Sequence, residues 1–147
     1  MNSSLSLTIL FGLVAVSFGV QFKDCGSKEG VVTAVKCTTG GSTACLLTRG
    51  ENATLEIDFK SNTAQKKLKN VVHGIIARLP VPFNPADADA CNGMEPKCPT
   101  EANKNYKFVT SLPVKTEYPT IRLVVKWEIQ DDQNNDVICI EIPAQIK

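Results

Sequence analysis

Apolar and polar side chains alternate along several stretches of this chain. In residues 55–60 (LEIDFK) every second side chain is apolar, and the same period runs through 121–130 (IRLVVKWEIQ), where Val124 is the exception. Alternation of this kind is typical of a β-strand with one buried face. Both stretches are therefore predicted to be strands, and further strands are predicted over 30–36, 71–79 and 106–112.

Turn-forming residues separate these stretches. The polar run DDQNND at 131–136 leads into an apolar run at 137–142, which predicts a C-terminal β-hairpin. No stretch has a convincing helical period. Short strands separated by turns favour an all-β fold, an immunoglobulin-like antiparallel β-sandwich of two sheets.

The length and the first residues indicate one secreted domain. A chain of 147 residues with 43% hydrophobic and 21% charged residues can form one globular domain with a real core. Residues 1–19 carry no charged side chain, include an apolar run at 5–16, and have small residues at Ser17 and Gly19. We interpret 1–19 as a signal peptide and 20–147 as the mature domain, because the apolar run is short for a membrane span and no later run approaches one.

The six cysteines fit an oxidising compartment, where they are most simply explained as three disulfides. Several pairings are open. The pairing preferred from positions along the chain is Cys37 with Cys45, Cys91 with Cys98, and Cys25 with Cys139. Zinc is the alternative, but no cysteine pair has the spacing of zinc ligands and the chain has one histidine, so we expect no metal.

Charge and composition argue against two function classes. Sixteen basic and fifteen acidic residues leave a net charge of +1, without the basic footprint of a nucleic-acid-binding protein. His73 is the only histidine that could activate a nucleophile, and it lies between Val72 and Gly74 in a predicted strand. Asp87 and Asp89 fall among proline and alanine in a predicted loop. We expect neither catalysis nor a cofactor.

Asn52 begins the motif Asn52-Ala53-Thr54, the one N-glycosylation sequon after residue 19. It lies just before a predicted strand. The motif predicts a glycan on Asn52, and the alternative is an unmodified surface asparagine.

The tripeptide Leu-Pro-Val occurs twice, at 79–81 and at 112–114, each time where a predicted strand ends. Proline has no N–H to donate and fixes its own backbone angle, so both segments are expected to leave the sheet as stiff, extended edges. If both lie at one end of the sandwich, their apolar side chains form a rim suited to an apolar ligand: Val81, Phe83, Val114 and Tyr118. The alternative is that these side chains only close the core.

Seven short motifs occur in a family-specific order: QFKDCGS, VVHGI, PVPF, LPVK, EYP, LVVKWEIQDD and CIEIP. Together they resemble the Niemann-Pick type C two group of the ML lipid-recognition domain family. The resemblance extends from residue 21 to residue 146.

This resemblance implies a sandwich of about seven strands whose sheets part to admit a lipid, without catalysis. The family's disulfides match the pairing preferred above. Its sterol contacts correspond to Phe83, Val114 and Tyr118, with Pro113 beside them and Trp127 toward the inside. In the family, unesterified cholesterol enters tail first and is carried in the lumen of late endosomes and lysosomes. A monomer that contacts membranes transiently and passes the sterol to a multispan transporter is therefore expected.

Two departures from vertebrate members leave the ligand open. Ile140 and Ala53 stand where those members carry aromatic residues, and the Cys37–Cys45 and Cys91–Cys98 spacings are longer than in that group. A divergent invertebrate member that carries fatty acids or small apolar signals outside the cell is the first alternative. A secreted immunoglobulin-like module that binds no lipid is the second, and a hydrolase is a distant third.

Overall fold

The structure is a computed structural model that describes residues 19–37 and 44–147. Most of the predicted signal peptide therefore lies outside the described residues. Within the described ranges, six strands have eight or more residues: β2 (Gly30–Cys37), β4 (Asn52–Ser61), β5 (Lys69–Ile76), β8 (Lys104–Pro113), β9 (Arg122–Gln130) and β10 (Asp136–Ile146). Shorter elements extend them: β1 (Lys23–Asp24), β3 (Cys45–Leu47), β6 (Leu79–Pro82), the 3₁₀ turn η1 (Ala90–Gly93) and β7 (Met94–Glu95).

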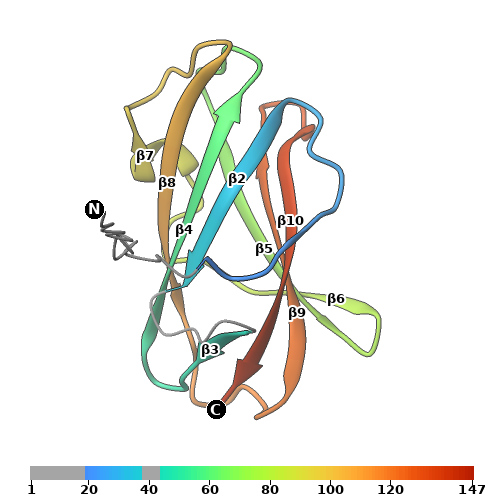
Figure 1. Ribbon diagram of the computed structural model, residues 1–147. Helices are drawn as coiled ribbons and strands as arrows, with labels where there is room; N and C mark the ends of the chain where they lie inside the picture. Colours follow the sequence, from blue (N-terminus) through green and yellow to red (C-terminus); the bar gives the residue numbers. More distant parts are fainter. Residues whose placement is uncertain (1–18, 38–43) are drawn as a thin grey trace, which may run out of the picture.

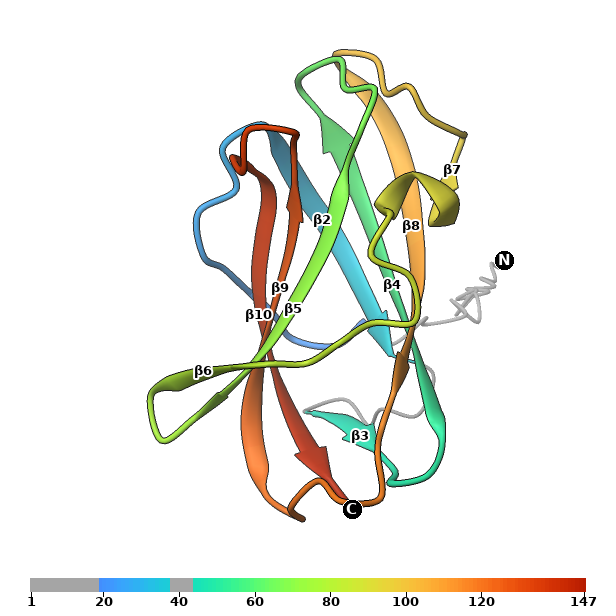
Figure 2. The ribbon, with the colours of Figure 1, turned by 180° about the vertical axis from the view of Figure 1, so that it is seen from behind.

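The strands form two layers, as Figures 1 and 2 show from opposite sides. One sheet has the order β1-β10-β9-β5-β6, with β3 also paired to β10, and the other has the order β2-β4-β8-β7. All pairs are antiparallel except β3 with β10. The predicted two-sheet antiparallel sandwich is confirmed, with this one parallel pair as an addition.

The core lies between the sheets, where the apolar side of each alternating strand faces inward. The predicted strand at 55–60 is the centre of β4, and its partner β8 sets Ile57 opposite Phe108. Trp127 of β9 is completely buried and lies 5.7 Å, centroid to centroid, from the ring of Phe108. This contact joins the two sheets across the middle of the sandwich.

The predicted C-terminal hairpin is confirmed, because β9 and β10 pair over most of their length. Its turn is held by Asp131, whose Oδ1 accepts hydrogen bonds of 2.9 Å from the backbone N–H groups of Gln133 and Asn135. Asn134 takes a positive φ of 64°, a conformation that asparagine tolerates better than most residues.

The strand predicted over 71–79 is wrong at its C-terminal end. β5 stops at Ile76, and the chain reverses through Ala77 and Arg78, which have φ values of 50° and 68°. Two successive residues of positive φ are the geometry of a tight hairpin turn whose twist matches the strands. Leu79–Pro82 then returns as β6 along β5.

The expectation that both Leu-Pro-Val segments leave their sheets is also wrong. Phe83 donates its backbone N–H to the Val72 carbonyl of β5 (2.9 Å). Successive backbone N–H groups of a strand point to opposite sides, so the nitrogens of Pro80 and Pro82 point away from β5, toward the free edge. The second segment stays attached to the turn before β4, because the Val114 N–H donates to the Glu51 carbonyl (2.9 Å). Proline is compatible with an edge strand when its missing N–H would have faced solvent.

Three disulfides link the described residues in the pairing preferred from sequence: Cys25–Cys139, Cys37–Cys45 and Cys91–Cys98. The first joins the segment after β1 to β10 across 114 residues of sequence. Closing so long a loop restricts the unfolded chain and contributes about 4–5 kcal/mol in the chain-entropy treatment.

Candidate functional site

A pocket of about 80 Å³ lies at the end of the sandwich where the β5–β6 hairpin, the start of β9 and the end of β10 meet the loop before β9. Its walls come from β5, β6, β9, β10 and the loop before β9. All the lining residues are apolar except for the hydroxyl of one tyrosine: Gly74, Ile76, Val81, Pro82, Phe83, Tyr118, Pro119, Leu123 and Ile146. Such a lining can hold hydrocarbon but offers almost nothing for proton transfer.

Two aromatic rings frame the pocket. Phe83 and Tyr118 meet edge to face, with centroids 5.0 Å apart and planes inclined at 72°. Phe83 is held by its backbone hydrogen bond to Val72, and Tyr118 lies in a turn where its N–H donates to the Lys115 carbonyl (3.2 Å). The contact brings the two proline-rich segments together at one end of the sandwich, as the rim prediction requires.

Gly74 leaves the pocket open on the β5 side. A Cβ at this position would lie 3.0 Å from Leu123 Cδ1 and 3.5 Å from Phe83 Cδ2. A side chain at position 74 would therefore have to displace Leu123, which lines the pocket.

The predicted binding residues divide into three groups in the structure. Val81, Phe83 and Tyr118 line the pocket. Val114 is buried in the adjoining core, and Trp127 is buried deeper between the sheets. Pro113 ends β8 opposite Asn52, in an outward-facing register between the inward-facing Leu112 and Val114. No contact with a ligand tests any of these roles, so they stay predictions.

A polar cluster between the sheets was missed at the sequence level. Asn70 of β5 accepts a hydrogen bond from Trp127 Nε1 (2.7 Å) and donates from Nδ2 to Thr110 Oγ1 of β8 (2.9 Å). The same Nδ2 donates to the Asp87 carbonyl (3.2 Å), and both Asn70 and Thr110 are buried. The signal was present, because Asn70 shares its parity with Val72, and Thr110 shares its parity with Phe108 and Leu112.

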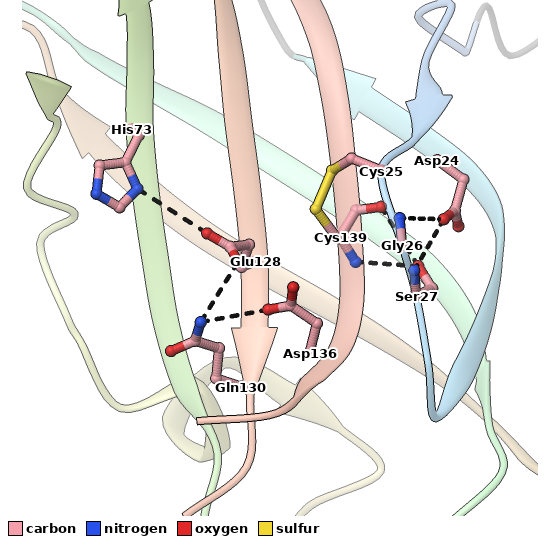
Figure 3. The surroundings of a disulfide bond; sticks show 9 residues. All are labelled: Asp24, Cys25, Gly26, Ser27, His73, Glu128, Gln130, Asp136 and Cys139. Carbon is pink, nitrogen blue, oxygen red and sulfur yellow. Dashed lines mark hydrogen bonds and ion pairs between the residues drawn. A yellow bond between two sulfur atoms is a disulfide. The ribbon is translucent and has the colours of Figure 1, made fainter. Parts of the chain in front are cut away.

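His73 and Glu128 form a contact on the outer face of the same sheet, shown in Figure 3. His73 Nδ1 lies 4.0 Å from Glu128 Oε1, and Gln130 Nε2 donates to Glu128 Oε2 (3.3 Å) and to Asp136 Oδ1 (3.2 Å). Burial, followed by the hydrogen bond and charge of Asp136, raises the pKa of Glu128 to about 7, and the charge of Lys126 opposes this rise.

The apolar surroundings of Glu128 explain why burial dominates. Its direct cross-strand neighbours are Val71 on β5 and the disulfide-bonded Cys139 on β10, and only 7% of Glu128 is exposed. Removal of a carboxylate from water disfavours its charged form. Glu29 and Asp131 form a second acidic pair. Burial and Asp131 raise the pKa of Glu29, whose Oε2 is buried without a hydrogen-bond partner.

The side chains of Glu128, Asp136 and Cys139 place potential metal-ligand atoms within 4.8 Å of one another. The sulfur of Cys139 is bonded to Cys25 and cannot act as a thiolate. Two carboxyl groups remain, one of them largely protonated below neutral pH, so we assign no metal to this group.

Comparison with known proteins adds to this geometry. The model of the ML-domain family matches residues 19–146. This chain belongs to the ML-domain family. The resemblance found in the short motifs is therefore confirmed over nearly the whole chain.

Relatives of this ML-domain chain carry informative names. It is 41% identical over 147 residues to "NPC intracellular cholesterol transporter 2" of Bos taurus, covering 96% of this chain and 97% of that protein. It is 39% identical over 137 residues to "NPC intracellular cholesterol transporter 2 homolog a" of Drosophila melanogaster, covering 92% and 93%. The "Ecdysteroid-regulated 16 kDa protein" of Manduca sexta is 37% identical over 144 residues, with 97% of each chain covered.

A solved structure supports the fold of the ML-domain chain. The Niemann-Pick type C2 protein from Japanese carpenter ant superposes with a TM-score of 0.77 at 22% identity, covering 86% of this chain and 99% of that one. In the part of the chain that the structure describes, no helix has the length and apolar character needed to cross a membrane.

Proposed function

We propose that this ML-domain chain is a lipid carrier that binds unesterified cholesterol or a related sterol between its sheets. The observation that carries the proposal is the apolar pocket framed by Phe83 and Tyr118 at one end of the sandwich. The bovine and fly relatives are named as cholesterol transporters, which supports a sterol as the ligand class.

Binding of a whole sterol requires the sheets to move apart at this end. The pocket encloses about 80 Å³, whereas sites for ligands of this size have about 300 Å³ or more. The layers behind the pocket are aliphatic, with Val72 and Val125 buried on the inner face of one sheet and Leu112 on the inner face of the other. Hydrocarbon of the ligand can replace these contacts without leaving a polar group unpaired.

The expected affinity is sufficient for transfer. A sterol of roughly 28 heavy atoms gaining about 0.3 kcal/mol per atom binds with about 8 kcal/mol, which is a micromolar dissociation constant. A pocket with almost no polar partners selects mainly by shape, because one methylene changes binding by only about 1–3 kcal/mol. Fatty acids and other small apolar molecules are therefore competing ligands.

The β5–β6 hairpin supports transient membrane contact. It projects beyond the sandwich next to the pocket, and Leu79 and Val81 are 66% and 44% exposed. The lining of the pocket thus continues onto an exposed apolar surface, and the turn carries the cation Arg78. Exposed apolar side chains next to a cation suit the boundary between lipid headgroups and acyl chains.

We further propose that the chain acts as a non-enzymatic monomer in the lumen of late endosomes and lysosomes or outside the cell. There it moves sterol between membranes or to a multispan sterol transporter. Secretion through a signal peptide at 1–19 and a glycan on Asn52 belong to this proposal. Asn52 is exposed at the start of β4 on the outer face of the second sheet, which leaves room for a glycan away from β6.

Lipid extraction and competition test the carrier function. The protein is purified from a eukaryotic secretion system, its lipids are extracted, and cholesterol and long-chain fatty acids are compared as competitors for a fluorescent sterol. We expect near one bound lipid per chain and stronger competition by cholesterol. Protein that carries no lipid and binds no apolar probe would contradict the carrier function, whereas preference for fatty acids would contradict only the sterol.

Two variants test the location of the site. Phe83→Ala removes one frame of the pocket, and Val114→Phe places a larger side chain in the adjoining core. We expect each to weaken sterol binding at least tenfold while the protein remains folded. Val31→Phe makes the same enlargement at an exposed position of β2 and serves as the control. If both site variants bind as tightly as the control, the pocket is placed wrongly.

A further inference from the structure

The buried cluster of Asn70, Thr110 and Trp127 crosses the gap between the two sheets. Both N–H donors and the carbonyl oxygen of an asparagine amide can be engaged at once. Here Nδ2 donates to Thr110 Oγ1 and to the Asp87 carbonyl, while Oδ1 accepts from Trp127 Nε1. The Asn70–Thr110 bond is a direct link from β5 of one sheet to β8 of the other.

The cluster lies directly behind the aliphatic layers of the pocket. Inward-facing residues along β5 run from Gly74 through Val72 to Asn70, and those along β9 run from Leu123 through Val125 to Trp127. Four residues of strand span about 13 Å. The polar cluster therefore lies about 13 Å inward from the residues that line the pocket.

A loop fastens the sheets together at the same level. The Asn70 backbone N–H donates to the Ala88 carbonyl (2.8 Å), and the Ala86 N–H donates to the Ser111 carbonyl of β8 (2.9 Å). Segment 86–88 is thus tied to both sheets beside the side-chain hydrogen bond. Separation of the sheets past this level must break directional bonds that hydrocarbon cannot replace, unlike the aliphatic contacts nearer the pocket.

We propose that Asn70 and Thr110, with Trp127, form the floor of the lipid cavity and set the length of apolar chain that this protein accepts. The inference rests on the proposed carrier function. The sheets part from the pocket inward as far as the floor and no farther. A ligand whose apolar part exceeds this depth leaves methylenes outside the cavity and gains no further affinity from them.

A homologous series of saturated fatty acids measures this depth. Their dissociation constants are obtained by displacement of anilinonaphthalene sulfonate, and Trp127, the single tryptophan of the chain, reports contact with the floor through its emission. In the wild type, each added methylene is expected to tighten binding about fourfold until a limiting length is reached. Trp127 emission should shift as that length is approached.

Two variants remove polar contacts of the floor. Thr110→Val removes the cross-sheet acceptor at nearly constant shape, and the double variant Asn70→Leu with Trp127→Phe replaces a hydrogen-bonded pair with apolar groups. Both are expected to move the limit to longer fatty acids. Thr100→Val is the matched control, because Thr100 is buried like Thr110 but lies outside the cluster. Its hydroxyl accepts from the Gln65 N–H and donates to the Thr63 carbonyl.

The outcomes separate the two proposals. A limit that stays fixed in Thr110→Val and in the double variant, or one that Thr100→Val moves equally, overturns the floor while leaving the carrier function intact. Affinity that rises with length without a limit in the wild type also overturns it. If neither the fatty acids nor cholesterol bind the wild type, the carrier function and the floor both fall.

Discussion

The two ends of the sandwich interior are built from different kinds of contact. Near the pocket, the facing side chains are mostly aliphatic, with a glycine and a framing aromatic pair. From the polar cluster inward the interior includes interacting aromatic rings: Trp127 of the cluster meets Phe108, and Phe59 meets Tyr106. A partly buried polar contact lies with them, because the Glu101 backbone N–H donates to Tyr106 Oη (2.8 Å).

This difference assigns separate tasks to the two ends. Aliphatic contacts have no direction and can be exchanged for the hydrocarbon of a ligand. Aromatic pairs and buried hydrogen bonds depend on orientation, and opening them exposes groups that a lipid cannot satisfy. We infer that the pocket end yields to a ligand while the opposite end keeps the two sheets in register.

Substitution of one phenylalanine at each end tests this division most directly. Phe59→Ala is expected to lower the free energy of unfolding by about 3–5 kcal/mol, because removal of a fully buried ring leaves a cavity beside Tyr106. Phe83→Ala should cost only about 1–2 kcal/mol, because its ring borders an existing pocket. Urea unfolding measures both.

Ligand binding should show the reverse order. Phe83→Ala is expected to weaken sterol binding at least tenfold, whereas folded Phe59→Ala should bind within about threefold of wild type. Equal stability losses, or equal losses of affinity, would show that the two ends are not distinct.

Acid should stabilise the protein through Glu128. The pKa of this carboxyl is raised from 4.5 to about 7 by burial and by Asp136, so the folded state binds a proton more tightly than the unfolded chain. The resulting stability is fully present below pH 4.5 and is lost as the pH rises through about 7. The difference is about 2–3 kcal/mol, with the charge of Lys126 and the hydrogen bond from Gln130 already opposing the rise in pKa.

Glu128→Gln isolates this effect, because glutamine imitates the protonated side chain. We expect the variant to be more stable than wild type at pH 7.5 and similar to it at pH 5, by thermal unfolding at both values. Glu56→Gln, an exchange on the outer face of β4 that leaves Glu128 untouched, is the control. Wild-type protein that is equally stable at both pH values would contradict the assignment.

Much of the fold could be predicted from sequence because burial imposes a period of two. The stretch around Trp127 and that around Ile57 show this period clearly, and both are central strands. The hairpin at Ala77 and Arg78 could not be predicted, because these residues rarely adopt positive φ and carry no turn signal. The turn depends on pairing between β5 and β6, which tertiary structure supplies.

The site was predictable in part for a similar reason. The prolines drew attention to Phe83 and Tyr118, which the structure places together at the pocket, and the role of these residues in binding stays a prediction. The expected effect of the prolines on the sheet was wrong. A missing N–H matters only if its side of the strand is paired, and the residue pattern does not show which side that is. Asn70 was overlooked because a single polar residue within an apolar pattern does not reveal its partners, which come from β8 and β9.

The smallest change that distinguishes the two ends is one methyl group at Gly74. In Gly74→Ala the new Cβ meets flexible side-chain atoms of Leu123 and Phe83, so the free energy of unfolding should change by less than about 1 kcal/mol. The same methyl occupies pocket space, and sterol affinity is expected to fall severalfold in a displacement assay.

Shortening the opposing side chain in the double variant Gly74→Ala with Leu123→Ala restores room in the pocket and should recover part of the affinity. Because the second change removes apolar contacts, recovery of binding together with lower stability would identify occupied space as the cause. Affinity that falls further in the double variant would instead mean that Leu123 itself holds the ligand.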